Sequence, residues 1–390
     1  MKKRSIAILY QDFFRERDFK RLGLNVLSKY FDLYLIEFSN SDSKENITLS
    51  KSKPENQNSD KYEITFIENY RQFYFFISDN SLNYYIDMMD YNFLSFRIRL
   101  LLKNRSVLRV KISLGLLPWV SYKINIVKKI LNLLKTGNFL SKLSKAFLTR
   151  IYIKLEPQVN IFLYSGSKSK STQPHKAFEI WTHSFDYQNY IKLENVKEFD
   201  HLGSYALFID QYAPSHPDYK FHKNKPPVSK KIYYDSINSF FDFFEKKTSV
   251  KVVIAGHPKR VGDTENNWNG RMQIIGKTPE LVKQSSLVIS HYSTAISHAV
   301  IFRKPILLIT TDEYWNSYRK HQFLAFSEAL NLKIVNTDKF NEFEITNEVF
   351  NINEESLIDY EEKYIRSKYS SSNDIWHHFS EKLYDQKLQQ

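Results

Sequence analysis

Three places in this sequence put side chains that can bind a phosphate or move a proton directly after an apolar, strand-like run. His257 follows one run through a single glycine, Ser293 and Thr294 follow a second, and Asp210 follows a third. A histidine held there can donate a hydrogen bond to a phosphate oxygen or protonate a leaving group. Hydroxyl residues at a helix start, with the free backbone N–H groups, form a phosphate site without a glycine-rich loop. A carboxylate at the third place can act as a general base if it reaches the same cleft.

Each of these residues also has a purely structural interpretation, because His-Pro is common in turns and Ser or Thr before a helix is commonly an N-cap. Their joint placement at the ends of successive strands favours function, since ligands of open α/β sheets bind at the carboxyl edge. Glu280 can favour a helix start through the dipole or bind ribose hydroxyls. The candidate donor-binding residues are His257, Pro258, Lys259, Lys277, Thr278, Glu280, Ser290, Ser293 and Thr294, with Lys259 or Arg260 as further sources of positive charge.

The elements that must position these residues alternate between strands and helices. In the second half, strands are expected at 205–210, 251–255, 287–290 and 305–310, with helices at 231–246, 279–284 (Thr278 as N-cap, Pro279 first) and 294–302. In the first half, strands are expected at 6–10, 31–38, 107–112 and 159–164, a helix at 19–30, and polar loops at 39–61 and 165–171. This alternation is typical of parallel sheets with helices on both faces.

The predicted fold class is therefore α/β, with two Rossmann-like domains and a cleft between them. The expected domains are an acceptor-side domain at 1–190, a nucleotide-sugar-binding domain at 191–352 and C-terminal helices at 353–390 that could cross back to the first domain. The helices expected within 354–387 are long and polar-faced.

A basic segment at 121–155 has two open interpretations. It contains eight Lys or Arg residues, no Asp or Glu, and apolar residues at helical spacing. Such helices can lie on an anionic membrane surface or pack their apolar face on the domain and expose their lysines to water. The basic residues are Lys123, Lys128, Lys129, Lys135, Lys142, Lys145, Arg150 and Lys154.

Composition narrows the function classes. The chain of 390 residues has no Cys, which excludes disulfides, thiolate metal sites and cysteine nucleophiles. Its 56 basic and 43 acidic residues give a net charge of +13, which indicates an anionic partner. Only 9 residues are Gly, and neither a P-loop nor an Asp-X-Asp pair after a strand occurs, so we expect no metal and no cofactor. No basic-aromatic module of nucleic-acid-binding proteins occurs, and we expect no nucleic-acid partner.

The apolar runs also bear on location. None reaches the roughly 18 residues of a membrane span, and the basic start precedes only about six apolar residues, too few for a secretory signal. We expect a cytoplasmic protein, with peripheral contact with the inner face of the plasma membrane left open.

The run from Val252 to Lys259, with Gly276–Val282 and Val288–Ser297, resembles the C-terminal half of bacterial surface-polysaccharide glycosyltransferases of GT-B fold. More narrowly, His257-Pro258 followed by Ser293-Thr294 is similar to the His-Pro and Ser-Ser/Thr motifs of bacterial sialyltransferases and Kdo transferases. The resemblance covers about residues 201–312. It implies that the histidine and the hydroxyl pair hold the phosphate of a CMP-activated sugar.

In the inverting members of that family, an acid from the other side of the cleft is the general base. The resemblance implies that Asp210 corresponds to this acid. The acidic motif with a following glycine is not reproduced at Asp210, and Asp186 is the rival acid. The catalytic candidates are thus Asp210, His257 and Asp186.

The expected function is metal-independent transfer of a sugar, a nonulosonic acid such as sialic acid or Kdo from its CMP donor, to a surface glycan or glycolipid. Two alternatives stay open. One is another nucleotide-sugar or polyol-phosphate transferase, or a sugar epimerase, on the same fold. The other is a non-enzymatic protein that binds a membrane or an anionic polymer.

Overall fold

The computed structural model describes residues 3–385 except 12–13, 15, 39–62, 120–138, 173–174, 194–197, 222–223, 261–264, 266 and 343–346. The loop predicted at 39–61 and the first part of the basic segment, 121–138, lie outside the described residues.

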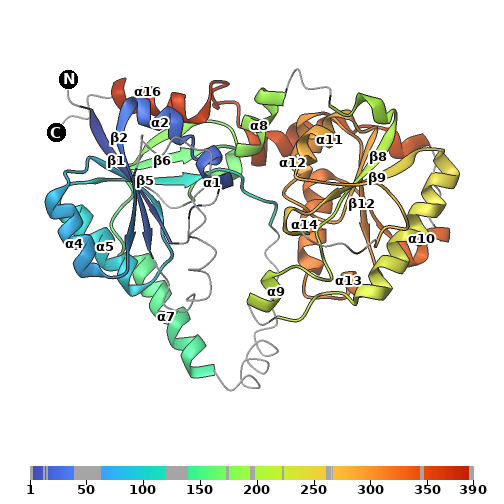
Figure 1. The fold of residues 1–390 in the computed structure, drawn as a ribbon, viewed down its shortest axis with the longest axis horizontal. Helices are drawn as coiled ribbons and strands as arrows, with labels where there is room; N and C mark the ends of the chain where they lie inside the picture. Colours follow the sequence, from blue (N-terminus) through green and yellow to red (C-terminus); the bar gives the residue numbers. More distant parts are fainter. Residues whose placement is uncertain are drawn as a thin grey trace.

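The first half of the chain forms a seven-stranded sheet in the order β3-β2-β1-β4-β5-β6-β7 (Figure 1). Its strands are β1 (Arg4–Tyr10), β2 (Phe31–Phe38), β3 (Glu63–Ile67), β4 (Tyr84–Met88), β5 (Leu108–Ser113), β6 (Ile161–Tyr164) and β7 (Phe178–Trp181). Its helices are α1 (Glu16–Arg21), α2 (Leu24–Tyr30), α4 (Tyr70–Asp79), α5 (Phe93–Asn104), α7 (Phe139–Leu155), the 3₁₀ turn η3 (Ser167–Ser169) and α8 (Phe185–Leu193).

The second half forms a six-stranded sheet in the order β10-β9-β8-β11-β12-β13. Its strands are β8 (Tyr205–Ile209), β9 (Lys251–Gly256), β10 (Gln273–Ile275), β11 (Leu287–Ser290), β12 (Ile306–Thr310) and β13 (Ile334–Asn336). Its helices are α9 (Asp218–Phe221), α10 (Lys230–Thr248), α11 (Thr278–Gln284), α12 (Ile296–Ile301), α13 (Asp312–Trp315) and α14 (Lys320–Leu330), with 3₁₀ turns η4 (Asp200–Leu202), η5 (Pro258–Arg260), η6 (Thr337–Glu342) and η7 (Asn347–Phe350).

The neighbouring strands of both sheets are paired in parallel. Buried apolar clusters lie on both faces of each sheet, which explains why the central strands are almost continuously hydrophobic. The predicted α/β class with two Rossmann-like sheets is confirmed. In each sheet the strand order reverses beside the first strand, so the switch points lie between β1 and β4 and between β8 and β11. Ligands of such sheets bind at the carboxyl ends of the strands at this point.

The end of the chain returns to the first sheet. After α15 (Glu354–Tyr360) and a π-helical turn η8 (Glu361–Ile365), the helix α16 (Ile375–Asp385) packs against α2 (Figure 1). Trp376, Phe379 and Leu383 are buried in the same apolar cluster as β1 and β2. The prediction of long helices here is wrong, because the segment at 366–374 separates two short ones.

The single helix predicted at 19–30 is also wrong. The chain breaks at Gly23, which has φ of +55°, between α1 and α2. The indole of Trp376 occupies the space beside it, since a Cβ at Gly23 would lie 2.1 Å from Trp376 Cδ1. The apolar spacing continues through the break, so periodicity alone could not reveal a contact made by a residue 353 positions later.

Two helix starts in the second half differ from the predictions. Helix α11 begins at Thr278 with Lys277 as N-cap and no side-chain capping bond, so Thr278 is not the N-cap. Helix α12 begins at Ile296, two residues after the predicted start, and its N-cap Ala295 makes no side-chain capping hydrogen bond. Ser293 and Thr294 therefore lie in the turn before the helix, and their hydroxyls are not used as caps.

Candidate functional site

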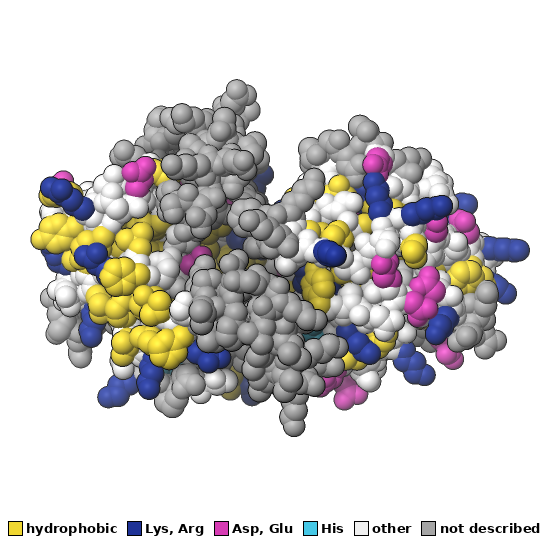
Figure 2. All heavy atoms as spheres, turned by 90° about the horizontal axis from the view of Figure 1, so that it is seen from below, with side chains coloured by type: hydrophobic (Ala, Val, Ile, Leu, Met, Phe, Trp, Pro, Cys, Tyr) yellow, Lys and Arg dark blue, Asp and Glu magenta, His cyan; other side chains and the backbone are white. Residues whose placement is uncertain are grey.

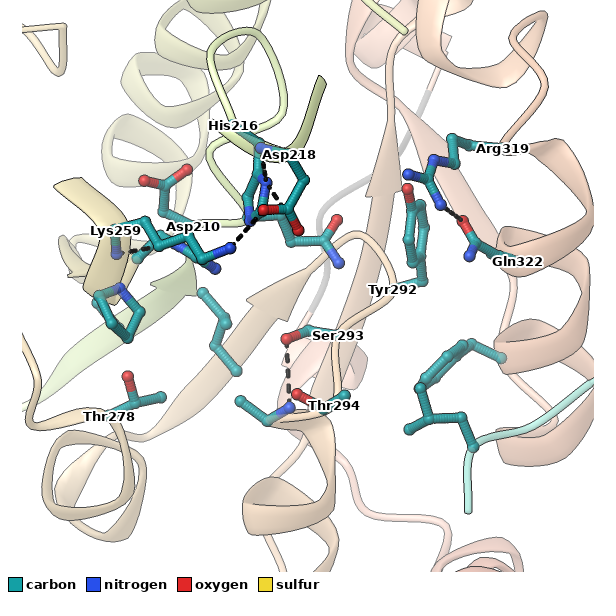
Figure 3. A pocket seen from close by; sticks show the side chains of 18 of the residues that line it. Asp210, His216, Asp218, Lys259, Thr278, Tyr292, Ser293, Thr294, Arg319 and Gln322 are labelled. Carbon is teal, nitrogen blue, oxygen red and sulfur yellow. Dashed lines mark hydrogen bonds and ion pairs between the residues drawn. The ribbon is translucent and has the colours of Figure 1, made fainter. Parts of the chain in front are cut away.

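A cavity of about 800 Å³ lies at the switch point of the second sheet. Its walls come from the ends of β8, β9 and β11, from α9, α14 and the start of α11, and from Leu117, Pro118 and Trp119 after β5. Of the predicted site residues, it is lined by Asp210, His257, Pro258, Lys259, Thr278, Ser293 and Thr294. The fold therefore brings residues from four separate segments to the lining of one cavity (Figure 3).

His257 is held as a hydrogen-bond donor. Its Nδ1 accepts a hydrogen bond from the backbone N–H of Lys259 at 3.1 Å. A neutral ring that accepts at Nδ1 carries its proton on Nε2. Burial, with the nearby His216, Lys259 and Arg260 charges, lowers the pKa of His257 to about 4. The ring is thus neutral at pH 7, with one N–H to donate.

Ser293 and Thr294 lie in the turn after β11, and Thr278, the first residue of α11, lines the same cavity (Figure 3). Ser293 Oγ accepts a weak hydrogen bond from the backbone N–H of Ala295 at 3.2 Å. Three hydroxyl residues and His257 therefore line one cavity. Such a set of short neutral donors suits the oxygens of a phosphate.

Asp210 is placed as a positioning residue. Its side chain is fully buried, and its Oδ2 accepts from Arg260 Nε at 2.6 Å. Its Oδ1 accepts from the backbone N–H of Tyr212 at 2.8 Å, and the backbone N–H of His257 also donates to the carboxylate. Burial raises the pKa of Asp210 and the Arg260 charge opposes that shift. These contacts anchor the His257 loop and Arg260, and they do not favour the general-base role predicted for Asp210.

A second group of side chains next to His257 was not predicted from the sequence. His216 faces His257 edge-on with ring centroids 4.9 Å apart. Asp218, which begins α9, accepts a hydrogen bond from Lys259 Nζ at 2.5 Å. Its Oδ2 lies 3.5 Å from His216 Nδ1. Asp218 is half exposed, whereas Asp210 has no exposed side-chain surface.

The opposite wall was missed as well. Arg319, Gln322, Tyr292 and Tyr314 line it, and Arg319 Nη1 donates to Gln322 Oε1 at 3.3 Å (Figure 3). Arg319 precedes α14 in a turn that carries no periodic pattern. One sequence signal could have indicated this wall. The chain that follows the predicted strand at 305–310 must begin at the carboxyl edge of the parallel sheet, where the cavity lies.

The remaining predicted residues do not line the cavity. Lys277 is exposed and pairs with Glu198 at 3.0 Å, and Glu280 lies 3.9 Å from Lys277. Ser290 is fully buried, and its Oγ has no hydrogen-bond partner among the described residues. Asp186 lies on α8, 3.7 Å from His298 Nε2. Arg260 is buried against Asp210.

No protein-family model and no curated protein sequence matches this chain. Solved structures do. A protein assigned as a UDP-N-acetylglucosamine 2-epimerase from Listeria monocytogenes is 12% identical with a TM-score of 0.52, over 100% of this chain and 98% of that one. The glycotransferase of kitacinnamycin is 8% identical with a TM-score of 0.51, over 99% of each chain. The wall teichoic acid polymerase TagF is 9% identical with a TM-score of 0.50, over 98% of this chain and 88% of that one.

These likenesses establish that the chain has the GT-B fold of two facing Rossmann-like sheets. At 8 to 12% identity they show the fold alone, and the reaction has to be argued from the residues of the cavity.

Proposed function

We propose that this chain is a glycosyltransferase of surface-glycan biosynthesis that takes a nonulosonic acid, such as sialic acid or Kdo, from a CMP donor. One observation carries the proposal: His257, Ser293, Thr294 and Thr278, from three different loops, line one cavity at the switch point of the second sheet. This is where a GT-B protein has its free carboxyl edge, and the donors there suit a phosphate.

His257 and the hydroxyls would hold the phosphate whose oxygen leaves with the nucleotide. The His257 ring is neutral, so it donates through Nε2 without adding a charge. The nearby Lys259 ammonium supplies electrostatic stabilisation as negative charge develops on the leaving group. Asp210 fixes the loop in position before the substrate binds, which lowers the reorganisation needed during the reaction.

We assign the general base to Asp218 in place of Asp210. Asp210 and Asp218 are the two carboxylates that line the cavity in the described part of the chain, and only Asp218 has an exposed side chain. In the transfer, the bond between the anomeric carbon and the phosphate oxygen breaks. The acceptor oxygen bonds to that carbon, and the acceptor proton passes to Asp218.

The test has a binding and a turnover part. CMP should raise the unfolding temperature where UDP and GDP do not, because a ligand at 100 times its Kd adds about 2.7 kcal/mol of stability. CMP release from CMP-sialic acid should fall about 10²–10³-fold in His257→Ala, the loss typical of one preorganised donor to a developing negative charge. His201→Ala, an exposed histidine outside the cavity, is the matched control. Full activity in His257→Ala would contradict the assignment, and protection by UDP alone would favour another nucleotide-sugar enzyme or an epimerase.

The acceptor side of the proposal rests on α7. Phe147, Leu148 and Leu155 are 63%, 44% and 60% exposed on this helix. Tyr152 stacks on Phe96 at 5.3 Å and holds the other face of α7 on α5. Figure 2 shows hydrophobic side chains gathered with Lys and Arg on the lower face of the first half. We propose that this face rests on an anionic phospholipid surface that carries a glycolipid acceptor.

No helix in the described parts of the chain is long and apolar enough to cross a membrane. Co-sedimentation with vesicles that contain an anionic phospholipid tests the surface contact. The double variant Phe147→Ser with Leu155→Ser should lose vesicle binding and keep CMP binding. Phe75→Ser, an exposed aromatic residue on α4, is the control. Equal vesicle binding by both variants would contradict the contact.

A further inference from the structure

The cavity contains one charge that the phosphate site does not use. Arg319 lines the wall opposite Lys259 (Figure 3). The guanidinium lies 4.9 Å from the centre of the Tyr318 ring and donates to the neutral Gln322 amide at 3.3 Å. Its Nε is buried and has no hydrogen-bond partner among the described residues. A buried, unsatisfied charged donor is costly unless a ligand completes it.

Each of the other charged side chains that line the cavity has an oppositely charged partner. Lys259 pairs with Asp218, and Asp210 pairs with Arg260 behind the wall. No described carboxylate lies within ion-pair distance of Arg319. His257 is neutral. Arg319 is therefore the uncompensated positive charge among the described lining residues, on the wall opposite Lys259.

The distribution fits a ligand with two separate anionic groups. Ser293 and Thr294 lie between Lys259 on one wall and Arg319 on the other (Figure 3). A cavity of about 800 Å³ lies within the range that holds a whole nucleotide-sized ligand. A planar guanidinium can bind a carboxylate or a phosphate through two parallel hydrogen bonds.

We propose that Arg319, supported by Gln322, binds a second anionic group of the donor, in addition to the phosphate held by His257 and the hydroxyls. The group is the carboxylate of an acidic sugar or a second phosphate of the nucleotide. This inference rests on the proposed nucleotide-sugar function and names the substrate class for it: a donor with two anions. Arg319 then determines specificity, since a donor with one anion leaves its charge unpaired.

The experiment compares ligands that differ by one anion. Isothermal titration of wild-type protein, Arg319→Gln and Arg319→Lys would use CMP, CDP and CMP-sialic acid. CDP, CMP-sialic acid or both should bind wild type more tightly than CMP. Arg319→Gln should lower the affinity for the tighter-binding ligand, or for both, about 10–100-fold, the loss typical of a charge-assisted hydrogen bond. The same variant should change CMP affinity less than about twofold, and Arg319→Lys should keep part of the gain.

The ligand that loses affinity in Arg319→Gln identifies the second anion. Loss confined to CMP-sialic acid identifies the carboxylate, and loss confined to CDP identifies the second phosphate. Arg71→Gln, an exposed arginine on α4, is the control and should change none of the affinities. Ligand-free unfolding temperatures of all variants verify that each one folds.

The inference and the proposed function fail in different ways. Equal weakening of CMP, CDP and CMP-sialic acid in Arg319→Gln, or no weakening at all, would overturn the inference and leave the His257 site standing. Binding of UMP and UDP without cytidine ligands would overturn the CMP donor, and the UDP-to-UMP ratio would then test Arg319. Absence of any nucleotide binding to wild type would overturn both.

Discussion

At the scale of single residues, the orientation of a histidine ring decides what it can do. His257 accepts from the backbone at Nδ1, so Nε2 is left as a donor. A glutamine amide can place an N–H near the same point, whereas alanine cannot. We expect His257→Gln to retain nucleotide binding within about threefold of wild type, since one neutral hydrogen bond contributes about 0.5–1.5 kcal/mol and is preserved.

Because the pKa of His257 is about 4, its ring should stay neutral between pH 5 and 7. Between pH 5 and 7, nucleotide affinity should therefore vary with pH in the same way in wild type and in His257→Gln. Titration calorimetry of both proteins across this range is the measurement. A step near pH 6.5 that is present only in wild type would show that the ring becomes charged and would contradict the neutral-donor role.

His291 links one buried ring to acid stability. It is fully buried, and its Nδ1 lies 2.7 Å from the carbonyl oxygen of Ile309, which can only accept. The proton is therefore on Nδ1, and Nε2 accepts from the Tyr233 hydroxyl at 2.7 Å. Because both nitrogens are satisfied in the neutral form, a charged ring has no place here, and burial lowers the pKa of His291 to about 4.

The sign follows from the lowered pKa. Above about pH 6.5 the ring is neutral in the folded and unfolded chain, and it contributes no pH dependence. Between pH 6.5 and 4 the unfolded chain binds a proton that the folded one does not, so the free energy of unfolding should fall by about 3 kcal/mol. The His257 shift acts in the same direction. Urea unfolding at pH 7, 5.5 and 4.5 should show this slope, reduced in His291→Asn; an unchanged slope in that variant would contradict the assignment.

At the scale of elements, the predictable ones are those whose apolar pattern is unbroken. The predicted strands overlap β1, β2, β5, β6, β8, β9, β11 and β12, and all of these except β5 are largely apolar. The segment that contains β4, α5 and their neighbours gave no such pattern. Its strand carries Asp87, its helix carries Arg99 on the inner face, and β5 carries Arg109, all of them buried.

These charges compensate one another, which a pattern of apolar residues cannot reveal. Arg99 Nε donates to Asp87 Oδ2 at 2.8 Å, and Arg109 Nη2 lies 2.7 Å from both Asp87 and Glu156. The site shows the same limit. His257, Ser293 and Thr294 follow strong strands and were predictable, whereas Asp218 and Arg319 come from short turns that only the folded sheet brings to the cavity.

The break at Gly23 is an element-scale feature that mutation can test. Gly23→Ala places a side chain at φ of +55°, which costs about 1–2 kcal/mol. It also forces the Trp376 indole away, which should cost a further ~1–3 kcal/mol. Gly270→Ala is the matched control, because it has φ of +78° and open space around it. Chemical denaturation should show a larger loss for Gly23→Ala, and equal losses would contradict the packing of α16 on the break.

At the scale of the whole molecule, the chain is stabilised where its end returns to its beginning. Trp376 Nε1 donates to the carbonyl of Arg21 at 2.8 Å, and Phe379 is fully buried against the first sheet. The described walls of the cavity come from the second sheet, except for the segment 117–119. Stability of the first sheet and nucleotide binding should therefore be separable.

Two buried phenylalanines allow a direct comparison. Phe379→Ala should lower the stability of the first sheet by about 3–5 kcal/mol and leave the Kd for nucleotide within about twofold. Phe240, equally buried on α10 beneath the second sheet, is the counterpart. Hydrogen exchange measured peptide by peptide should show faster opening of β1 and β2 in Phe379→Ala, and faster opening of β8 and β9 in Phe240→Ala. Nucleotide should then slow exchange of β8 and β9 in Phe379→Ala as much as in wild type, because ligand binding stabilises the unit that forms the site. A Phe379→Ala protein that folds but binds nucleotide tenfold more weakly would contradict this separation, because it would show that the two sheets act as one cooperative unit.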